Sequence, residues 1–172
     1  TTPQPQVQDQ RQSLQSSTSN SFTMDLPTTR PAGDLYIAVL CHDGTGFSVN
    51  PPDGSWIEYA DDREHAAYYK IGEDKGGGNE QASYTWTKTG GTGEIWAGAI
   101  MRITGFDTSD PISGTPTTDS SGSNSRPEFP AVTPDNNNTL VIRAAGADND
   151  TPSTSGAWVP SNHTRIAAGT PN

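Results

Sequence analysis

Residues 33–44 carry the sequence GDLYIAVLCHDG, an apolar run enclosed by a Gly-Asp and an Asp-Gly pair. The run that begins at Leu35 is too short for a core helix, and its Leu, Ile, Val and Tyr residues favour a strand. Glycines and an Asp-Gly pair are typical of the turns that end strands. The sequence therefore predicts a buried central strand, with Cys41 as a small buried hydrophobic residue near its end.

The same pattern returns in residues 139–150, which read TLVIRAAGADND. Each run leads into an acidic turn, and a tryptophan follows each, Trp56 after the first run and Trp158 after the second. We therefore expect two related halves within one domain. The halves cover residues 21–106 and 128–172, and a crossover rich in Ser, Thr, Gly and Pro, residues 107–127, joins them.

The two halves predict which side chains meet in the core. The two central strands should lie beside each other with their apolar residues buried. These residues are Leu35, Ile37, Val39, Leu140 and Ile142. Because almost nothing follows Trp158, we also expect an open strand edge in the second half. Either further strands beyond Asn172 or a strand donated by a partner should cover that edge.

The composition predicts short strands and many turns. Only 30% of the 172 residues are hydrophobic, and 18 glycines and 14 prolines interrupt the chain. No segment keeps a helical period, so we expect an all-β fold without a helix. The fold class is an antiparallel two-sheet β-sandwich with a jelly-roll or Greek-key path, because the long crossover argues against an up-and-down barrel. The predicted strands lie at residues 22–26, 35–41, 66–72, 82–87, 94–105, 129–132, 140–147 and 163–169.

The N-terminal segment, residues 1–20, differs from the rest of the chain. It is rich in Gln, Ser and Thr and is nearly free of apolar side chains. Such a segment cannot bury enough apolar surface to order itself. We expect either a flexible tail or an arm that docks on another subunit, and the single sandwich domain then spans residues 21–172.

Charge and hydropathy exclude two kinds of partner. Twenty acidic and ten basic residues give a net charge of −10, which repels phosphate backbones and argues against nucleic-acid binding. No apolar run reaches the roughly 18 residues of a membrane span, so we expect no membrane insertion. A single cysteine excludes an internal disulfide.

The residues that could carry chemistry form no recognisable constellation. The histidines lack the spacing of a zinc site, and the carboxylates lack the spacing of a calcium-binding loop. Carboxylates are expected in an acidic protein, so they do not indicate a glycosidase pair. No serine stands in a nucleophile elbow. We therefore expect no catalytic residue, no cofactor and no metal ion. The residues weighed are His42, His65, His163, Glu58, Asp61, Asp62, Glu64, Asp148, Asn149 and Asp150.

The four tryptophans allow two interpretations. They could form a platform on which a sugar stacks, but their places beside the central strands favour core packing. They are Trp56, Trp86, Trp96 and Trp158.

Three asparagines, Asn137, Asn149 and Asn162, stand in glycosylation sequons, which matter only if the protein passes through a glycosylating pathway.

A family resemblance rests on six segments taken together. They read PAGDLYIAVLCHDG, PPDGSWIEY, HAAYYKIG, ASYTWT, WAGAIMRITGFDTSDPI and NTLVIRAAGAD. Their series, from about Phe22 to Ile166, resembles a β-sandwich domain that recurs in structural proteins of tailed bacteriophages and in bacterial surface or secreted proteins. The chain departs from that pattern after Ile166, where the resemblance calls for further strands.

The resemblance implies a non-enzymatic module of a virion, either a head decoration or a tail or fibre protein, with a role in surface adhesion. Its implied location is the virion or an extracellular surface. Its implied partners are other virion or surface subunits, including copies of itself in a homo-oligomer, and a glycan of the host surface. The alternative from another class is a secreted bacterial carbohydrate-binding or adhesin domain, which would bind through exposed Trp or Tyr residues and loop carboxylates. Exposure of Trp56 and Trp158 would favour it.

Overall fold

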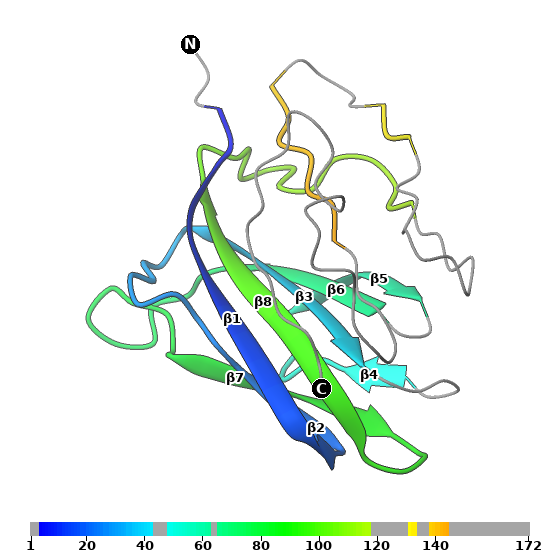
Figure 1. Cartoon of the computed structure of the whole chain (residues 1–172). Helices are drawn as coiled ribbons and strands as arrows, with labels where there is room; N and C mark the ends of the chain where they lie inside the picture. The colour runs from blue at the N-terminus through cyan, green and yellow to red at the C-terminus, as the bar shows by residue number, and fades with distance from the viewer. Residues whose placement is uncertain (1–3, 43–47, 63–64, 118–130, 134–137, 145–172) are drawn as a thin grey trace, which may run out of the picture.

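Figure 1 shows the computed structural model of the chain, which describes residues 4–42, 48–62, 65–117, 131–133 and 138–144. These residues form eight strands and no helix, so the predicted all-β class is confirmed. The strands are β1 (Gln6–Ser19), β2 (Ser21–Asp25), β3 (Leu35–His42), β4 (Ser48–Asn50), β5 (Ile57–Asp62), β6 (His65–Ile71), β7 (Ser83–Thr89) and β8 (Glu94–Thr104).

The strands form two antiparallel sheets. One sheet has the order β1-β8-β3-β6-β5 and the other the order β2-β7-β4. The pairs β1 with β8, β2 with β7 and β3 with β6 are nested, as in one long hairpin that is folded over itself. Nested pairing across two sheets is a jelly-roll path, one of the two paths that the sequence predicted. At the tip of this hairpin the path splits, because β4 joins β7 while β5 joins β6.

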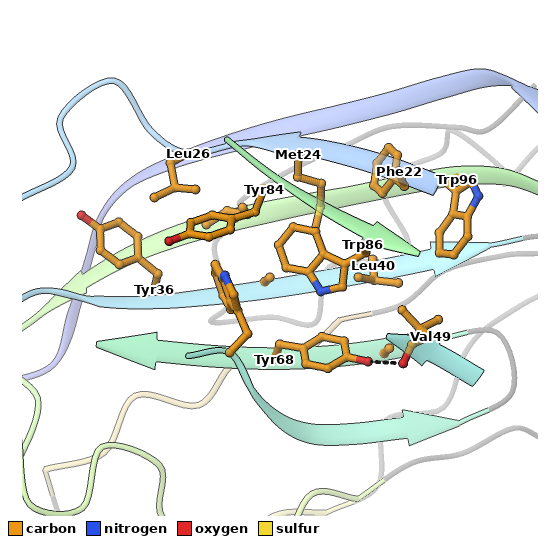
Figure 2. Close-up of a cluster of buried hydrophobic side chains, with 14 residues drawn as sticks. Phe22, Met24, Leu26, Tyr36, Leu40, Val49, Tyr68, Tyr84, Trp86 and Trp96 are labelled. Atoms are coloured by element: carbon orange, nitrogen blue, oxygen red, sulfur yellow. Dashed lines mark hydrogen bonds between the residues drawn. The ribbon is translucent and has the colours of Figure 1, made fainter. Parts of the chain in front are cut away.

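The core lies between the two sheets and is dominated by aromatic rings (Figure 2). Phe22 of β2 stacks on Trp96 of β8 with ring centroids 5.8 Å apart, and Tyr68 of β6 meets Trp86 of β7 at 6.3 Å. Each contact joins a residue of one sheet to a residue of the other. Burying a side chain of this size contributes about 1.5–3 kcal/mol, so these contacts hold the sheets together as a sandwich.

Gly98 of β8 leaves no room for a side chain between the two sheets. A Cβ atom at this position would meet Met24 Sδ of the opposite sheet, and it would lie 2.9 Å from the carbonyl oxygen of Val39. The absence of a side chain at Gly98 therefore lets β2 of the facing sheet pack closely against β8.

The five-stranded sheet has a second apolar face on its outer side. Leu35, Met101 and Ile103 are buried, yet they alternate with the inward-facing residues of β3 and β8 and do not belong to the inner cluster. The chain after β8 crosses on this side, where Tyr59 donates its hydroxyl to the carbonyl oxygen of Gly114 at 3.1 Å. A strand that is covered on both faces reads as a continuous apolar run, which explains residues 35–41.

Three expectations about burial meet different outcomes. Phe22, Met24 and Leu26 are all buried, and exposed residues alternate with them in β2, so the strand predicted at residues 22–26 is confirmed. Ile37 and Val39 share the outer face with Leu35 and are only half-buried, so the expectation that both are buried is wrong. Cys41 lies on the same face and is also only half-buried, so the expectation that it is a buried residue is wrong as well.

The prediction of a flexible or partner-docking arm is wrong for most of residues 1–20. Gln6–Ser19 is β1, an edge strand that pairs with β8 of its own domain. None of its described side chains is buried, which agrees with the expectation that the segment buries little apolar surface. The strand is held instead by main-chain pairing, which composition does not register.

The second central strand is not formed in the described residues. Residues 138–144 contain no strand, and Leu140 and Ile142 are half-buried rather than core residues. Their expected place beside Leu35 is taken by β6 and β8, which pair with β3 on its two sides. Residues 131–133 are exposed and not in a strand, and the remainder of the predicted second half lies outside the described residues.

Candidate functional site

The histidines that were weighed as metal ligands do not come together. His42 is buried in the core, with its ring 5.1 Å from that of Trp96. His65 begins β6 on the other side of the same sheet, since it pairs with Cys41. His163 lies outside the described residues. Within residues 4–42, 48–62, 65–117, 131–133 and 138–144, no three His, Cys, Asp or Glu side chains gather as a metal site would require.

The acidic residues of β5 line an edge strand rather than a cleft. Glu58 is exposed, and its Oε2 atom lies 3.4 Å from the hydroxyl of Tyr68. Asp61 is exposed on the same strand. The side chains of Asp62 and Glu64, and all of residues 148–150, lie outside the described part of the structure.

The tryptophans that the structure describes are core residues. Trp56, Trp86 and Trp96 are at most 3% exposed, and Trp56 packs edge-on against Trp86 with ring centroids 5.1 Å apart. The preferred interpretation, core packing, is therefore confirmed for these three. Trp158 lies outside the described residues.

The strongest concentration of polar chemistry is a buried network at one end of the sandwich. It consists of Lys70 on β6, Glu80 in the loop before β7, and Tyr84 on β7. The ammonium group of Lys70 lies 2.8 Å from Glu80 Oε2 and donates to the Tyr84 hydroxyl oxygen at 2.7 Å. The side chains of Lys70 and Glu80 are completely buried. The network thus ties the two sheets together.

Glu80 accepts four hydrogen bonds. Its Oε1 atom accepts from the Tyr84 hydroxyl and the Gln81 amide, and its Oε2 atom accepts from Lys70 and the Glu73 amide, all at 2.7–2.8 Å. Burial alone would raise the pKa of this carboxyl group, but these donors outweigh it and hold the pKa below its usual range. Burial and the adjacent carboxylate raise the pKa of Tyr84, which keeps its hydroxyl protonated as a donor.

The network holds an exposed loop, residues 72–80. Three consecutive glycines there, residues 76–78, have φ angles of 145°, 62° and 78°, which side chains rarely adopt. Asp74 Oδ1 accepts the amides of Gly76 and Gly78 at 2.8 and 2.9 Å and so closes the turn. Two of the three glycine amides are therefore engaged by the chain's own carboxylate.

The segment before β3 docks on this loop. Glu80 donates its amide to the carbonyl oxygen of Arg30 at 2.8 Å, and Arg30 returns a hydrogen bond from Nε to the Glu80 carbonyl. Pro31 and Asn79 form an antiparallel bridge. The two loops lie side by side at one end of the sheets (Figure 1), so the end of the sandwich is a fixed surface.

The chemistry of the network is structural. The Lys70 ammonium faces the rings of Tyr84 and Trp56 at 4.8 and 5.8 Å, and Glu80 neutralises it. A sealed cation of this kind has no path to a substrate. Sequence reasoning missed the network, although Lys70 shares the phase of Ala66 and Tyr68 and could have been identified as inward-facing; no sequence signal points to Glu80 as its partner.

Comparison with protein-family models, with curated proteins and with solved structures finds no match to this chain. Among the described residues there is also no helix of the length and hydropathy that a bilayer span needs. The function must therefore be argued from the residues themselves.

Proposed function

We propose that this chain is a non-enzymatic structural module of a tailed-bacteriophage particle, either a head decoration or a tail or fibre protein on the virion surface. In this role it binds other subunits, including copies of itself, and its exposed end loops contact host or matrix surfaces. The resemblance of the six sequence segments supports the particle, and the jelly-roll path is compatible with it because viral capsid domains use this architecture.

The buried network is the observation that carries the proposal. Lys70, Glu80 and Tyr84 are sealed from solvent, and they fix an exposed loop instead of facing an open site. The buried charges of Lys70 and Glu80 therefore stabilise the conformation of the exposed loop. A rigid surface suits a module that binds neighbouring subunits, because little conformational entropy is lost on binding.

The alternative, a secreted carbohydrate-binding or adhesin domain, finds no exposed platform among the three described tryptophans. Sugar platforms need exposed aromatic faces, whereas Trp56, Trp86 and Trp96 are packed in the core. Trp158 lies outside the described residues. We prefer the virion module because the three described tryptophans are core residues.

An antibody against the purified chain tests the proposal. Immunogold electron microscopy of particles induced from the host that carries the gene should show label at repeated positions on heads, tails or fibres. Label on the bacterial surface alone, together with binding of the purified chain on a glycan array, would refute the virion role and favour the alternative. Matched particles from a strain that lacks the gene control for the antibody.

A further inference from the structure

Within the described residues, β1 is an edge strand of the five-stranded sheet. Within the described residues β1 has one strand neighbour, β8, and its other side is open (Figure 1). The pairing with β8 is regular from Asp9 to Gln15, between two register shifts. Proteins commonly protect such edges with Lys or Pro, and Gln6–Ser19 contains neither. Leu14 is 54% exposed on this strand.

One main-chain amide of β1 is hydrogen-bonded to a side chain of its own strand. Gln10 donates its amide to Oδ1 of the adjacent Asp9 at 2.8 Å. A strand amide that is directed at a paired strand finds a carbonyl oxygen there, so this one faces the open side. The carboxylate of Asp9 fills the position that the carbonyl oxygen of an added strand would occupy.

The charges of β1 are arranged symmetrically about Gln10. Asp9 precedes this residue and Arg11 follows it, and they are the two charged residues of the strand. When two copies of an antiparallel strand pair about a central residue, the residue before the centre lies opposite the residue after it. An axis at Gln10 therefore places Asp9 of each copy opposite Arg11 of the other.

The neighbouring registers are disfavoured by the same charges. An axis at Asp9 would oppose two carboxylates, and an axis at Arg11 would oppose two guanidinium groups, both of which are destabilising. Arg11 already binds Asp25 of its own chain through Nη2 at 3.1 Å, and its remaining donors are available to a second carboxylate. The guanidinium group can thus bridge Asp25 and Asp9 of the other copy.

We propose that two copies of this chain associate through β1, edge to edge and antiparallel, about a two-fold axis at Gln10. The two five-stranded sheets become one continuous sheet, and each Asp9 exchanges its intrachain hydrogen bond for an ion pair across the interface. The contact is isologous, so it closes as a dimer and does not extend into a filament. It deepens the assembly part of the proposed function, but its test needs no virus particle.

Charge exchange on the full-length chain tests this register. Sedimentation equilibrium should show a concentration-dependent dimer for the wild type. Asp9→Arg places arginines opposite each other and Arg11→Asp places carboxylates opposite each other, so each variant alone should dimerise roughly tenfold or more weakly. Mixed together, the two variants restore both ion pairs and should form a heterodimer, and the double variant D9R/R11D should dimerise with itself.

A proline variant separates the edge from the charges. Gln10→Pro removes the amide that faces the open side and leaves the pairing with β8 in place, so it should remain a folded monomer with an unchanged circular-dichroism spectrum. A wild type that stays monomeric at about 100 μM, a weak but measurable affinity range, would overturn the proposal. A dimer that persists in Gln10→Pro, or single variants that fail to pair on mixing, would overturn it too. None of these outcomes bears on the immunogold result.

Discussion

Replacing Glu80 by glutamine tests the buried network most directly. The substitution keeps the shape of the side chain but exchanges one carboxylate oxygen for an NH2 group and removes the charge. Four donors surround the carboxylate, two at each oxygen. Whichever way the amide turns, two of these donors face the NH2 group, and the Lys70 ammonium remains in the core without its closest counter-charge.

The expected loss is large because Lys70 cannot reach water. Its side chain is completely buried, and its next carboxylate, Glu73, is 3.6 Å away and half-exposed. Removing one partner of a buried ion pair costs about 3–5 kcal/mol. A domain of this size is stable by about 5–15 kcal/mol, so about a fifth or more of the stability is lost. At about 2–4 °C per kcal/mol, we expect the melting temperature to fall by about 6–20 °C.

Urea unfolding, followed by tryptophan fluorescence, measures this loss. Glu73→Gln is the matched control, because it removes a carboxylate from the same lysine at the exposed side and should change the midpoint little. The variant K70M/E80Q removes the stranded cation as well and should recover part of the stability of E80Q. A loss below about 1 kcal/mol for E80Q with an unchanged denaturant slope would refute the argument that the network is sealed.

The remaining predictions concern pH, packing and the thiol. The folded-state pKa of Glu80 lies below its ordinary 4.5, so its contribution to stability is complete above that value and is lost as the pH falls through the lowered pKa. The urea midpoint of the wild type should therefore fall with decreasing pH in this range. The same fall should be smaller in E80Q. Gly98→Val forces atoms into Met24 and the β3 backbone, and we expect about 1–3 kcal/mol of destabilisation and no such effect at exposed Gly54, tested as Gly54→Ala. Tyr68→Phe removes the buried hydrogen bond to the Val49 carbonyl oxygen and should cost about 1–3 kcal/mol by calorimetry. Burial raises the pKa of Cys41 to about 11, so iodoacetamide should alkylate it roughly a hundredfold more slowly at pH 8 than the unfolded chain, and a rate equal to that of the unfolded chain would contradict this.

The parts of the fold that sequence reasoning identified are those where side chains carry the signal. In β7, Tyr84 and Trp86 alternate with exposed residues because one face of the strand is buried. The apolar run of β3 is unbroken because both of its faces are covered. Both strands were predicted at nearly their observed positions. The aromatic core followed from the same signal, because large rings beside central strands have few other places to go.

The parts that were missed depend on main-chain pairing or on distant partners. β1 is polar along its whole length and owes its place to the backbone of β8, so composition suggested an unstructured arm. Leu140 and Ile142 have the pattern of a core strand but not its position, because β3 already has a neighbour on each side. The phase of Lys70 in its strand could have identified it as an inward-facing residue. Its contact with Glu80 depends on a loop geometry that no local pattern encodes.

The nested order of the strands also constrains when the domain can form. β1 and β3 both need β8 between them, and β8 is the last of the eight strands to leave the ribosome. Contacts between such distant segments make folding slow, on the scale of milliseconds to seconds. A nascent chain that stops before Glu94 keeps two hydrogen-bonding edges open at once, next to a half-covered aromatic core. We expect such chains to aggregate or to recruit chaperones, and not to accumulate as a stable partial domain.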